Sequence, residues 1–197
     1  MRVLVACEFS GVVRDAFIRA GHDAWSCDLL PSEAPGPHLE SDVTKHIGDG
    51  WDLMIAHPPC TYLSNMSNCR AKEAGRMEGR KRAMQFFMAM VDAPIAHIAV
   101  ENPRGFPERD YRRADQIIQP YHFGHPESKA TCLWLKNLPR LTPTKIVNPN
   151  RKWDGRRWRT WVDTHTTHTS KRRSVTFHGI AEAMAEQWGR IAAERTA

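Results

Sequence analysis

A short apolar run that stops at two prolines is the feature that most constrains this chain. Residues 52–56 (DLMIA) have the composition of a buried parallel strand, and residues 57–60 (HPPC) follow at once. Proline lacks a backbone N–H and fixes φ, so neither proline can extend the strand, and the chain must leave the sheet as a stiff loop. Cys60 is therefore expected just beyond the carboxyl end of a strand, which is where open α/β sheets bind ligands.

Cys60 itself has two readings at this point. A thiolate is the most reactive of the common side-chain nucleophiles, so a cysteine held on a rigid loop at such an edge could be a positioned nucleophile. It could equally be a small, half-buried residue that happens to follow two prolines. The stretch alone leaves both readings open.

The composition is that of a soluble single-domain protein. The chain has 197 residues, of which 41% are hydrophobic and 25% charged, and no run approaches the apolar length that a membrane span needs. Residues 1–4 lead into a strand rather than a signal peptide, so we expect a cytoplasmic protein with no membrane partner. The five cysteines are scattered without a CxxC pair, which favours free thiols.

The first 28 residues outline a cofactor-binding frame. The pattern predicts a strand at 3–6, a break at 8–11, a helix from 12 that stops near Gly21, and a strand at 24–27 that ends in Asp28. A turn, a helix N-terminus and a carboxylate in this order suit a nucleotide-like cofactor. The turn lacks GxGxxG, however, so a dinucleotide site is not expected, and Gly11 could also mark only a tight turn.

The remaining pattern continues as alternating helices and strands, which predicts an α/β fold. Glu101-Asn102-Pro103 ends a strand just as the prolines do before Cys60, so adjacent strands would put Glu101 near Cys60. A carboxylic acid there could donate or share a proton while sulfur attacks. The further elements expected are a loop at 31–37, helices at 78–91, near 112–119 and at 180–191, and strands at 95–100 and 130–135, the last with Cys132 buried in it.

A basic and aromatic segment lies between residues 151 and 173. Basic side chains neutralise phosphates, and tryptophans such as Trp153 and Trp158 can stack on bases, so the segment favours nucleic-acid contact over a merely solvated charged face. His165 and His168 have a ligand-like spacing without other ligands nearby, so no metal site is expected. The candidate nucleic-acid-binding residues are Arg151, Lys152, Arg156, Arg157, Arg159, Lys171, Arg172 and Arg173.

Taken in order, these motifs resemble those of the DNA cytosine-5 methyltransferase family. The residues that carry the resemblance are Phe9-Ser10-Gly11, Asp28, Asp42, Pro58-Pro59-Cys60 and Glu101-Asn102. It runs from residue 1 to about 135 and returns more weakly at 174–190. It implies one class I (Rossmann-like) methyltransferase domain over 1–197, with a mostly parallel sheet, helices on both faces, and a reduced recognition region at about 139–173.

The resemblance implies S-adenosylmethionine as cofactor and DNA as partner. Phe9 would lie against the cofactor, Gly11 would let it approach the backbone, Asp28 would hold the ribose hydroxyls, and Asp42 would meet the adenine. The full implied cofactor set is Glu8, Phe9, Ser10, Gly11, Asp28, Leu29, Asp42, Val43 and Pro58.

The resemblance also implies catalytic roles for Cys60, Glu101, Asn102 and Lys129. Cys60 would add to carbon 6 of a flipped-out cytosine, which activates carbon 5 toward the methyl group. Glu101 would hydrogen-bond the ring nitrogen and amino group, and Asn102 would help to fix the loop. Lys129 would keep one cation of the two that the family places there.

Several departures leave other functions open. Residues 127–131 (ESKAT) stand where the family has a Gln-Arg-x-Arg-like segment, Thr61 follows the cysteine where glutamine is common, and the chain is far shorter than typical members. The alternatives are the same chemistry on RNA or on a modified or free pyrimidine nucleotide, a catalytically silent relative that binds nucleic acid or cofactor, and a plain nucleotide-binding domain.

The basic segment generates a test of its own. Replacing all three of Arg156, Arg157 and Arg159 by alanine should weaken DNA binding across sequences. If each side chain meets one phosphate, the slope of the logarithm of the binding constant against the logarithm of the salt concentration should flatten by about three units. Binding titrations over a series of salt concentrations measure the slope. A triple variant with the wild-type slope would show that these side chains are merely solvated.

Overall fold

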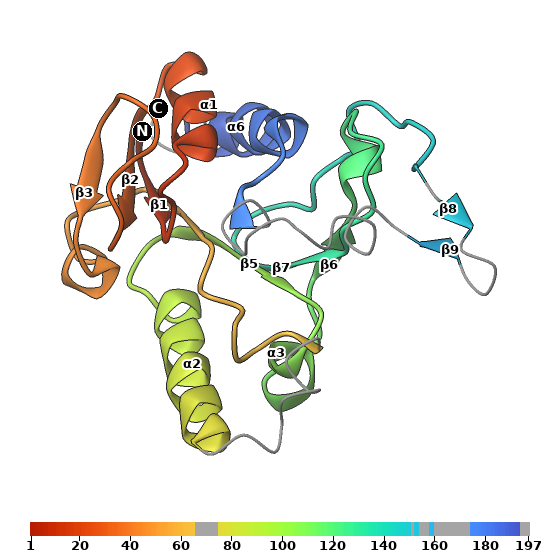
Figure 1. The fold of residues 1–197 in the computed structure, drawn as a ribbon. Helices are drawn as coiled ribbons and strands as arrows, with labels where there is room; N and C mark the ends of the chain where they lie inside the picture. The colour runs from red at the N-terminus through yellow and green to blue at the C-terminus, as the bar shows by residue number, and fades with distance from the viewer. Residues whose placement is uncertain (66–74, 151, 154–157, 160–173, 194–197) are drawn as a thin grey trace.

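The structure is a computed structural model, and it describes residues 1–65, 75–150, 152–153, 158–159 and 174–193. Its helices and strands alternate along most of the chain (Figure 1). The strands are β1 (Arg2–Ala6), β2 (Asp23–Asp28), β3 (His38–Glu40), β4 (Leu53–Ala56), β5 (His97–Pro103), β6 (Gln116–Ile118), β7 (Thr131–Lys136), β8 (Lys152–Trp153) and β9 (Trp158–Arg159). The helices are α1 (Val12–Arg19), α2 (Arg76–Val91), α3 (Phe106–Asp110) and α6 (His178–Ala193), with short 3₁₀ turns η1 (Val43–Lys45) and η3 (Pro120–His122).

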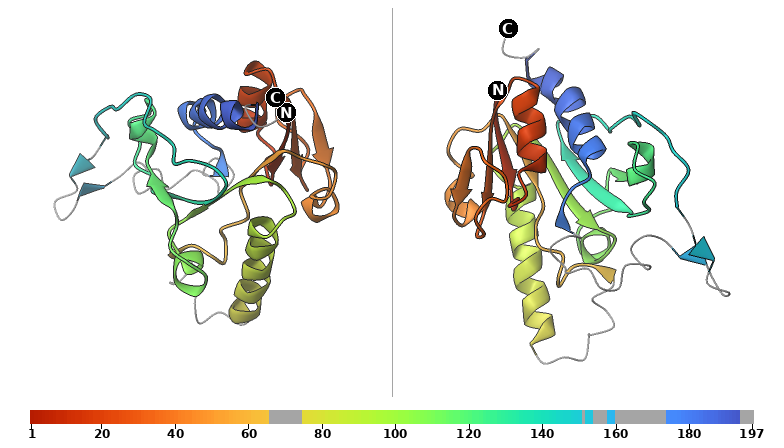
Figure 2. Two further views of the ribbon diagram at one scale, coloured as in Figure 1. Left: turned by 180° about the vertical axis from the view of Figure 1, so that it is seen from behind. Right: turned by 45° about the horizontal axis from the view of Figure 1, so that its top comes forward.

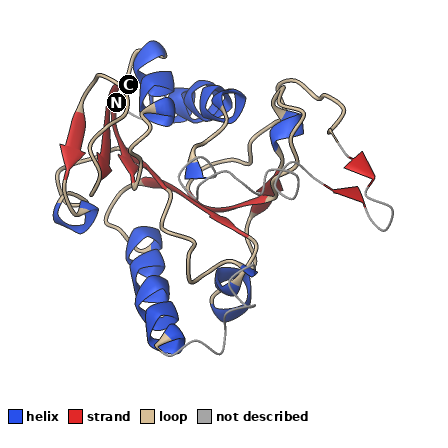
Figure 3. Ribbon diagram, viewed as in Figure 1, coloured by secondary structure: helices blue, strands red, loops and turns tan. Residues whose placement is uncertain are grey.

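One seven-stranded sheet organises the molecule, in the order β3-β2-β1-β4-β5-β7-β6. The strands from β3 to β5 pair in parallel, and β7 runs antiparallel between β5 and β6. Figure 3 shows these strands as one twisted layer. The sheet confirms the expected fold class as far as its architecture goes, a mixed, mostly parallel α/β sheet. Because the chain winds to one side after β1 and to the other after β4, the strand order reverses between them, and the carboxyl ends of these two strands form the crevice of such folds.

Helices cover both faces of the sheet (Figures 1 and 2). Alternate residues of β1 point to opposite faces, so Val3 and Val5 join one apolar cluster and Leu4 the other. The first cluster includes Phe17 of α1 and Trp188 of α6, and the second is built around Phe87 of α2. Helix α6, expected at residues 180–191, therefore packs against α1 over the sheet.

The helix expected near residues 112–119 was wrong. Residues 116–118 form the edge strand β6 instead, which pairs antiparallel with β7. The adjacent β-branched residues Ile117 and Ile118 suit a strand better than a helix. The helix lies earlier, at α3, where Pro107 occupies the first turn that tolerates a missing N–H. Strand β3 was also missed, because its three residues follow a proline-rich loop.

The other expected elements match the structure closely. Residues 131–136 form a strand in which Cys132 is fully buried, and the helix expected at 78–91 spans Arg76–Val91. Of the helices in the described ranges, none is both long and apolar enough to cross a bilayer. The pair β8–β9 forms a separate two-stranded sheet within the basic segment.

Candidate functional site

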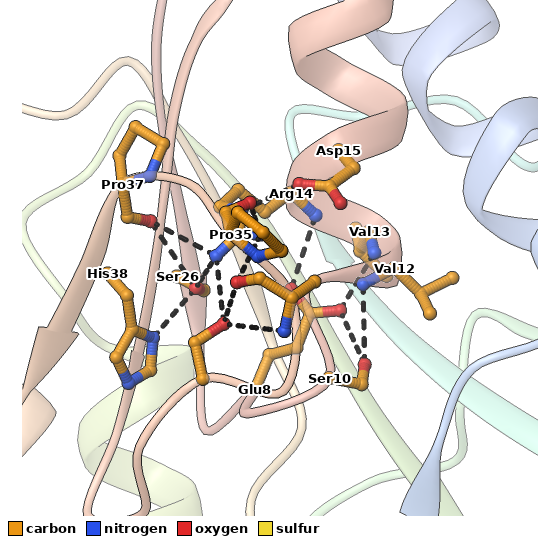
Figure 4. Close-up of polar contacts among 12 residues, drawn as sticks. Glu8, Ser10, Val12, Val13, Arg14, Asp15, Ser26, Pro35, Pro37 and His38 are labelled. Carbon is orange, nitrogen blue, oxygen red and sulfur yellow. Dashed lines mark hydrogen bonds and ion pairs between the residues drawn. The ribbon is translucent and has the colours of Figure 1, made fainter.

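The turn after β1 is built around the buried carboxylate of Glu8. Its Oε1 accepts the backbone N–H of Val13 at 2.7 Å and its Oε2 that of Arg14 at 3.2 Å, while the Ser10 hydroxyl donates to Oε1 at 3.1 Å (Figure 4). A carboxylate at this end also complements the helix dipole. Glu8 therefore satisfies the first turn of α1, and those N–H groups are not available to an anion.

Gly11 is required at this turn for a reason besides cofactor access. It lies at the N-cap of α1 with φ of 76°, in the left-handed region that favours glycine. A Cβ atom at residue 11 would stand 2.5 Å from an Nη2 of Arg14. The residue that the sequence assigns to cofactor approach thus also makes room for a buried guanidinium.

Arg14 ties the loop between β2 and β3 to the cofactor frame. Its side chain is fully buried, and Nε donates to Asp15 Oδ1 at 2.8 Å. Its Nη atoms donate to Ser26 Oγ at 3.1 Å and, in the loop, to Pro35 O at 2.9 Å (Figure 4). Further bonds reach Ser32 Oγ, Ala34 O and Pro37 O. A buried guanidinium needs this many acceptors to offset its lost hydration.

The two candidate cofactor carboxylates differ in how far they are engaged. Asp28 ends β2 and accepts the Leu30 N–H with Oδ1 at 2.9 Å. Asp42 caps the turn η1 and accepts both the N–H and the hydroxyl of Thr44, and these two bonds hold its pKa below the ordinary value. Burial raises the pKa of Cys27 to about 11, helped by the charges of Asp28 and Asp42, so both carboxylates act on the same strand end.

The other implied cofactor residues fall into buried and exposed groups. Phe9 and Val43 are buried, the latter at 4% exposure in the core beneath the sheet edge. Leu29 is 74% exposed beside Asp28, which leaves an apolar side chain uncovered where an aromatic ring could lie. Pro58 is buried and acts through its carbonyl, as described next.

The loop that carries Cys60 is braced from three directions. Asn102 is buried and donates Nδ2 to Pro58 O at 2.8 Å. Arg76 of α2 donates to Thr61 O at 3.0 Å. Phe106 N–H donates to Leu63 O at 2.8 Å, where a Cβ at Gly105 would collide with that same carbonyl. These contacts fix the loop as the prolines predict.

Cys60 is the exposed thiol among the four cysteines in the described ranges. Cys27 and Cys132 are buried and Cys7 is partly buried. Burial raises the pKa of Cys7 well above its usual value and that of Cys132 to about 12, each assisted by nearby carboxylates. Since the thiolate is the nucleophile, the raised pKa of these three thiols disfavours them as nucleophiles, and Cys60 is the candidate that a substrate can reach.

Glu101 lies next to His57, and His57 precedes Cys60 by three residues in the sequence. Strands β4 and β5 are adjacent as expected, with Ala56 opposite Val100, and His57 Nδ1 is 3.2 Å from Glu101 Oε2. Burial is the largest single influence on the pKa of Glu101 and raises it. The hydrogen bond from His57 and the charges of Lys129 and His57 together outweigh burial, so the pKa lies below its ordinary value. Glu101 is therefore a carboxylate rather than a carboxylic acid at neutral pH.

A small hollow brings part of the predicted catalytic set together. Its polar lining includes His57, Glu101, Lys129 and two threonines, and its apolar lining comes from Phe177 and the first two turns of α6. Cys60 is not among its lining residues. The complete lining is His57, Glu101, Lys129, Thr131, Thr176, Phe177, Ile180 and Met184.

His57 is the residue of this site that the sequence reasoning missed. It was read only as the first residue of the loop that leaves the sheet, because a lone histidine before two prolines has no motif of its own. The signal that could have found it is positional: with β4 and β5 in parallel register, His57 and Glu101 each follow a paired residue. Two titratable residues at equivalent strand ends are expected to meet.

The predicted nucleic-acid-binding residues lie mostly outside the described residues. These are Arg151, Arg156, Arg157, Lys171, Arg172 and Arg173, together with the histidines of the 165–168 segment. The backbones of Lys152 and Arg159 are paired in β8–β9. Over the described ranges, no group of three or more histidine, cysteine, aspartate or glutamate residues could hold a metal ion.

Comparison with known proteins finds similarity at the level of structure. No protein-family model matches the sequence, and no curated protein matches it as a relative. The Entamoeba histolytica methyltransferase EhMeth is 16% identical over 75% of this chain and 57% of its own, with a TM-score of 0.48. A Spodoptera frugiperda DNMT2 variant is 15% identical over 78% of this chain and 56% of its own, with a TM-score of 0.44. This chain spans little more than half the length of either protein.

The hydrogen bonds of Arg14 predict that the protein loses much of its stability when the guanidinium is replaced by an apolar side chain of similar length. Arg14→Met keeps the aliphatic stem but leaves the carbonyls of the loop without their donor, so it should lower the free energy of unfolding by about 2 to 4 kcal/mol. Urea denaturation measures this. Arg19→Met on the same helix is the control, because Arg19 is exposed and makes one long ion pair at 3.9 Å, and it should change stability by less than about 1 kcal/mol. Equal losses in the two variants would contradict a special role for Arg14.

Proposed function

We propose that this chain is an S-adenosylmethionine-dependent methyltransferase that acts on carbon 5 of cytosine in DNA through a covalent bond to Cys60. The observation that carries the proposal is the meeting of two features at one sheet edge. The turn at Glu8–Gly11 and Asp28 follow β1 and β2, while the braced Cys60 loop and Glu101 belong to β4 and β5. A cofactor at the first pair would face a substrate at the second across the crevice.

The cofactor frame fits a ligand without phosphate groups. Phosphates bind helix N-termini through free N–H groups, but Glu8 already occupies those of α1 and adds a negative charge there. S-adenosylmethionine has no phosphate and carries cationic groups that suit a carboxylate. Asp28 Oδ2 has no hydrogen-bond partner within the described part of the chain and is positioned at the strand end to accept ribose hydroxyls.

Cys60 would provide the nucleophile. Its thiolate adds to carbon 6 of cytosine, which moves electron density to carbon 5 and to the ring nitrogen. The cofactor, when bound, supplies an electrophilic methyl group to carbon 5. Loss of the carbon 5 proton then expels the thiolate and restores the aromatic ring.

Glu101 would hold the base rather than protonate it in the resting site. Its ionised carboxylate accepts from the exocyclic amino group, and Lys129 and His57 balance its charge. Asn102 keeps Pro58 in place, so that the cysteine is presented in one conformation. The exposed position of Cys60 outside the hollow also fits a relative that binds nucleic acid without turnover, and the trapping experiment below separates the two.

Cofactor binding should depend on Asp28. Asp28→Ala removes a charge-assisted acceptor worth about 1.5 to 3 kcal/mol, so S-adenosylmethionine should bind roughly ten- to a hundred-fold more weakly, as measured by calorimetry. Asp23→Ala is the matched control, because Asp23 is an exposed carboxylate at the opposite end of the same strand. Unchanged affinity in Asp28→Ala would remove this residue from the site.

The covalent step should depend on Cys60. Wild-type protein should form a denaturant-resistant adduct with a DNA oligonucleotide containing 5-fluorocytosine, because fluorine at carbon 5 prevents the final elimination, whereas Cys60→Ser should form none. Cofactor binding and DNA retention should remain in Cys60→Ser. An RNA oligonucleotide of the same sequence reports the alternative substrate. A Cys60→Ser protein that still methylates DNA would contradict the covalent mechanism. If the wild-type protein forms no adduct with either DNA or RNA, a protein that binds nucleic acid without catalysis would be favoured.

Glu101→Gln keeps the shape of the hollow but places an amide where a carboxylate accepts hydrogen bonds. Turnover should fall by about a hundred-fold or more, with a much smaller change in cofactor affinity. The double variant with Cys60→Ser should be little worse than Cys60→Ser alone, because groups that act in one step are not additive. Single-turnover methylation assays measure both, and a Glu101→Gln rate near wild type would contradict the assignment.

A further inference from the structure

Arginines of α2 and of the segment around α3 flank the loop that carries Cys60, and the proposed chemistry does not use their charge. Residues 76–82 and 104–113 together contain eight basic and three acidic side chains. The two segments meet in space, because the Cζ of Arg80 in α2 lies 3.5 Å from the centre of the Phe106 ring in α3 (Figure 1). A basic excess gathered at one place attracts polyanions.

The Cys60 loop is held between these two segments. The carbonyl of Cys60 accepts the N–H of Ser64 at 3.0 Å, so the chain makes one tight turn after the thiol. Ser64 forms a β-bridge with Gly105, the residue before α3, and Arg76 at the start of α2 donates to Thr61 O at 3.0 Å. Both helices therefore begin against the turn that contains the proposed nucleophile.

Arg80 carries a charge that no carboxylate balances within the described part of the chain. Its guanidinium lies over the Phe106 ring, and its Nε is buried without a hydrogen-bond partner among the described residues. The acid closest to it along the helix, Glu78, pairs with Arg82 instead, at 4.0 Å. A buried donor of a charged group that lacks an acceptor is costly. Arg80 as a whole is only partly buried, so an anion from outside can reach its guanidinium.

Two further arginines lie close to Arg80. The Cζ of Arg109 is 4.4 Å from the centre of the same Phe106 ring, and its charge is partly balanced by Asp110 at 2.7 Å. Arg104 is exposed, and no ion pair is found for it over the described ranges. A guanidinium that already lies against an aromatic ring loses less freedom when it binds, and its planar fork matches two oxygens of a phosphate. The three cations are therefore suited to a phosphate ligand.

We propose that Arg80, Arg104 and Arg109 form a phosphate-binding surface that holds the DNA backbone beside the target cytosine. This inference rests on the proposed function and deepens it, because it adds DNA contacts next to Cys60 to those assigned to the basic segment at 151–173. An enzyme that flips a nucleotide rotates it about its backbone. Cations beside the nucleophile can hold that backbone while the base enters the site.

A merely solvated charged face has a different appearance. Its arginines pair with carboxylates of their own helix, as Arg190 does with Glu186 at 3.1 Å in α6. Arg80 and Arg104 have no such partner in the described chain, and Arg80 is placed over a ring instead. The absence of balancing acids at this position favours an external anion.

The first test measures the salt dependence of DNA binding. Arg80→Gln combined with Arg104→Gln removes two cations, so the slope of the logarithm of the binding constant against that of the salt concentration should flatten by about two units, and binding should weaken about ten-fold or more. Arg19→Gln combined with Arg190→Gln is the matched control, because it removes the same charge from exposed side chains of α1 and α6, and it should leave the slope unchanged. Thermal unfolding and S-adenosylmethionine binding establish that both proteins are folded.

The second test locates the contact on the DNA. In a series of oligonucleotides, one phosphate at a time on either side of the target cytosine is replaced by a neutral methylphosphonate. Wild-type protein should lose about ten-fold in affinity at one or two of these positions. Arg80→Gln should be insensitive at one of them, because the effects of two groups in contact are not additive. Arg80→Lys keeps the charge without the planar fork, so it should keep the wild-type salt slope and bind more weakly than wild type.

The contrary results differ in what they overturn. A wild-type slope in the double variant, or losses from Arg80→Gln and from every methylphosphonate that simply add, would overturn the surface, while DNA binding and covalent trapping by the wild-type protein would leave the proposed function in place. A wild-type protein that binds no DNA would overturn both. If Arg80→Gln fails to fold, Arg104→Gln still decides, because Arg104 is exposed and its loss alone should flatten the slope by about one unit. An unchanged slope in Arg104→Gln would then contradict the surface.

Discussion

The parallel pairing of β4 with β1 on one side and β5 on the other is the constraint on which this structure depends. Strand β4 is buried at every position and supplies both apolar clusters, because its alternate residues face opposite sides of the sheet. Its register puts Ala56 beside Ala6 and Val100, so the turn after β1, the loop after β4 and Glu101 in β5 all emerge at one edge. A shift of β4 by one residue would exchange its two faces and separate His57 from Glu101.

The features that could be predicted from the sequence are those that depend on strand β4 and the prolines that follow it. An apolar run cut by two prolines has one sensible structure, and so β4, the Cys60 loop and the α/β class followed from local pattern. The helix expected near 112–119 failed, because the pairing of Ile117 with Cys132 in β7 is a long-range contact that local periodicity does not contain. Arg14 and His57 were missed for a related reason. Apart from Asp15, the partners of Arg14 lie 12 to 23 residues away, and Glu101 lies 44 residues from His57.

The glycine turn shows how one residue can meet two demands. A cofactor turn and a tight helix start both call for glycine with positive φ, and Gly11 has it. The structure adds Arg14, whose guanidinium fills the space beside both Gly11 and Gly36. The buried Glu8 carboxylate and the buried Arg14 guanidinium together hold the helix start and the following loop without ligand. A frame whose polar groups are already paired within the protein would need little rearrangement to bind a ligand, which is what preorganisation requires.

The electrostatics of Glu101 decide what this edge can do chemically. Burial alone would have kept its proton and made it a general acid, as the sequence reasoning allowed. The structure places His57 and Lys129 beside it, and their combined effect lowers its pKa below the ordinary value despite burial. An ionised Glu101 can accept from an amino group but cannot protonate a ring nitrogen. In the proposed mechanism, any proton that the ring nitrogen takes up during attack would therefore come from the imidazole, Lys129 or water, and the carboxylate would hold the base by accepting from its amino group.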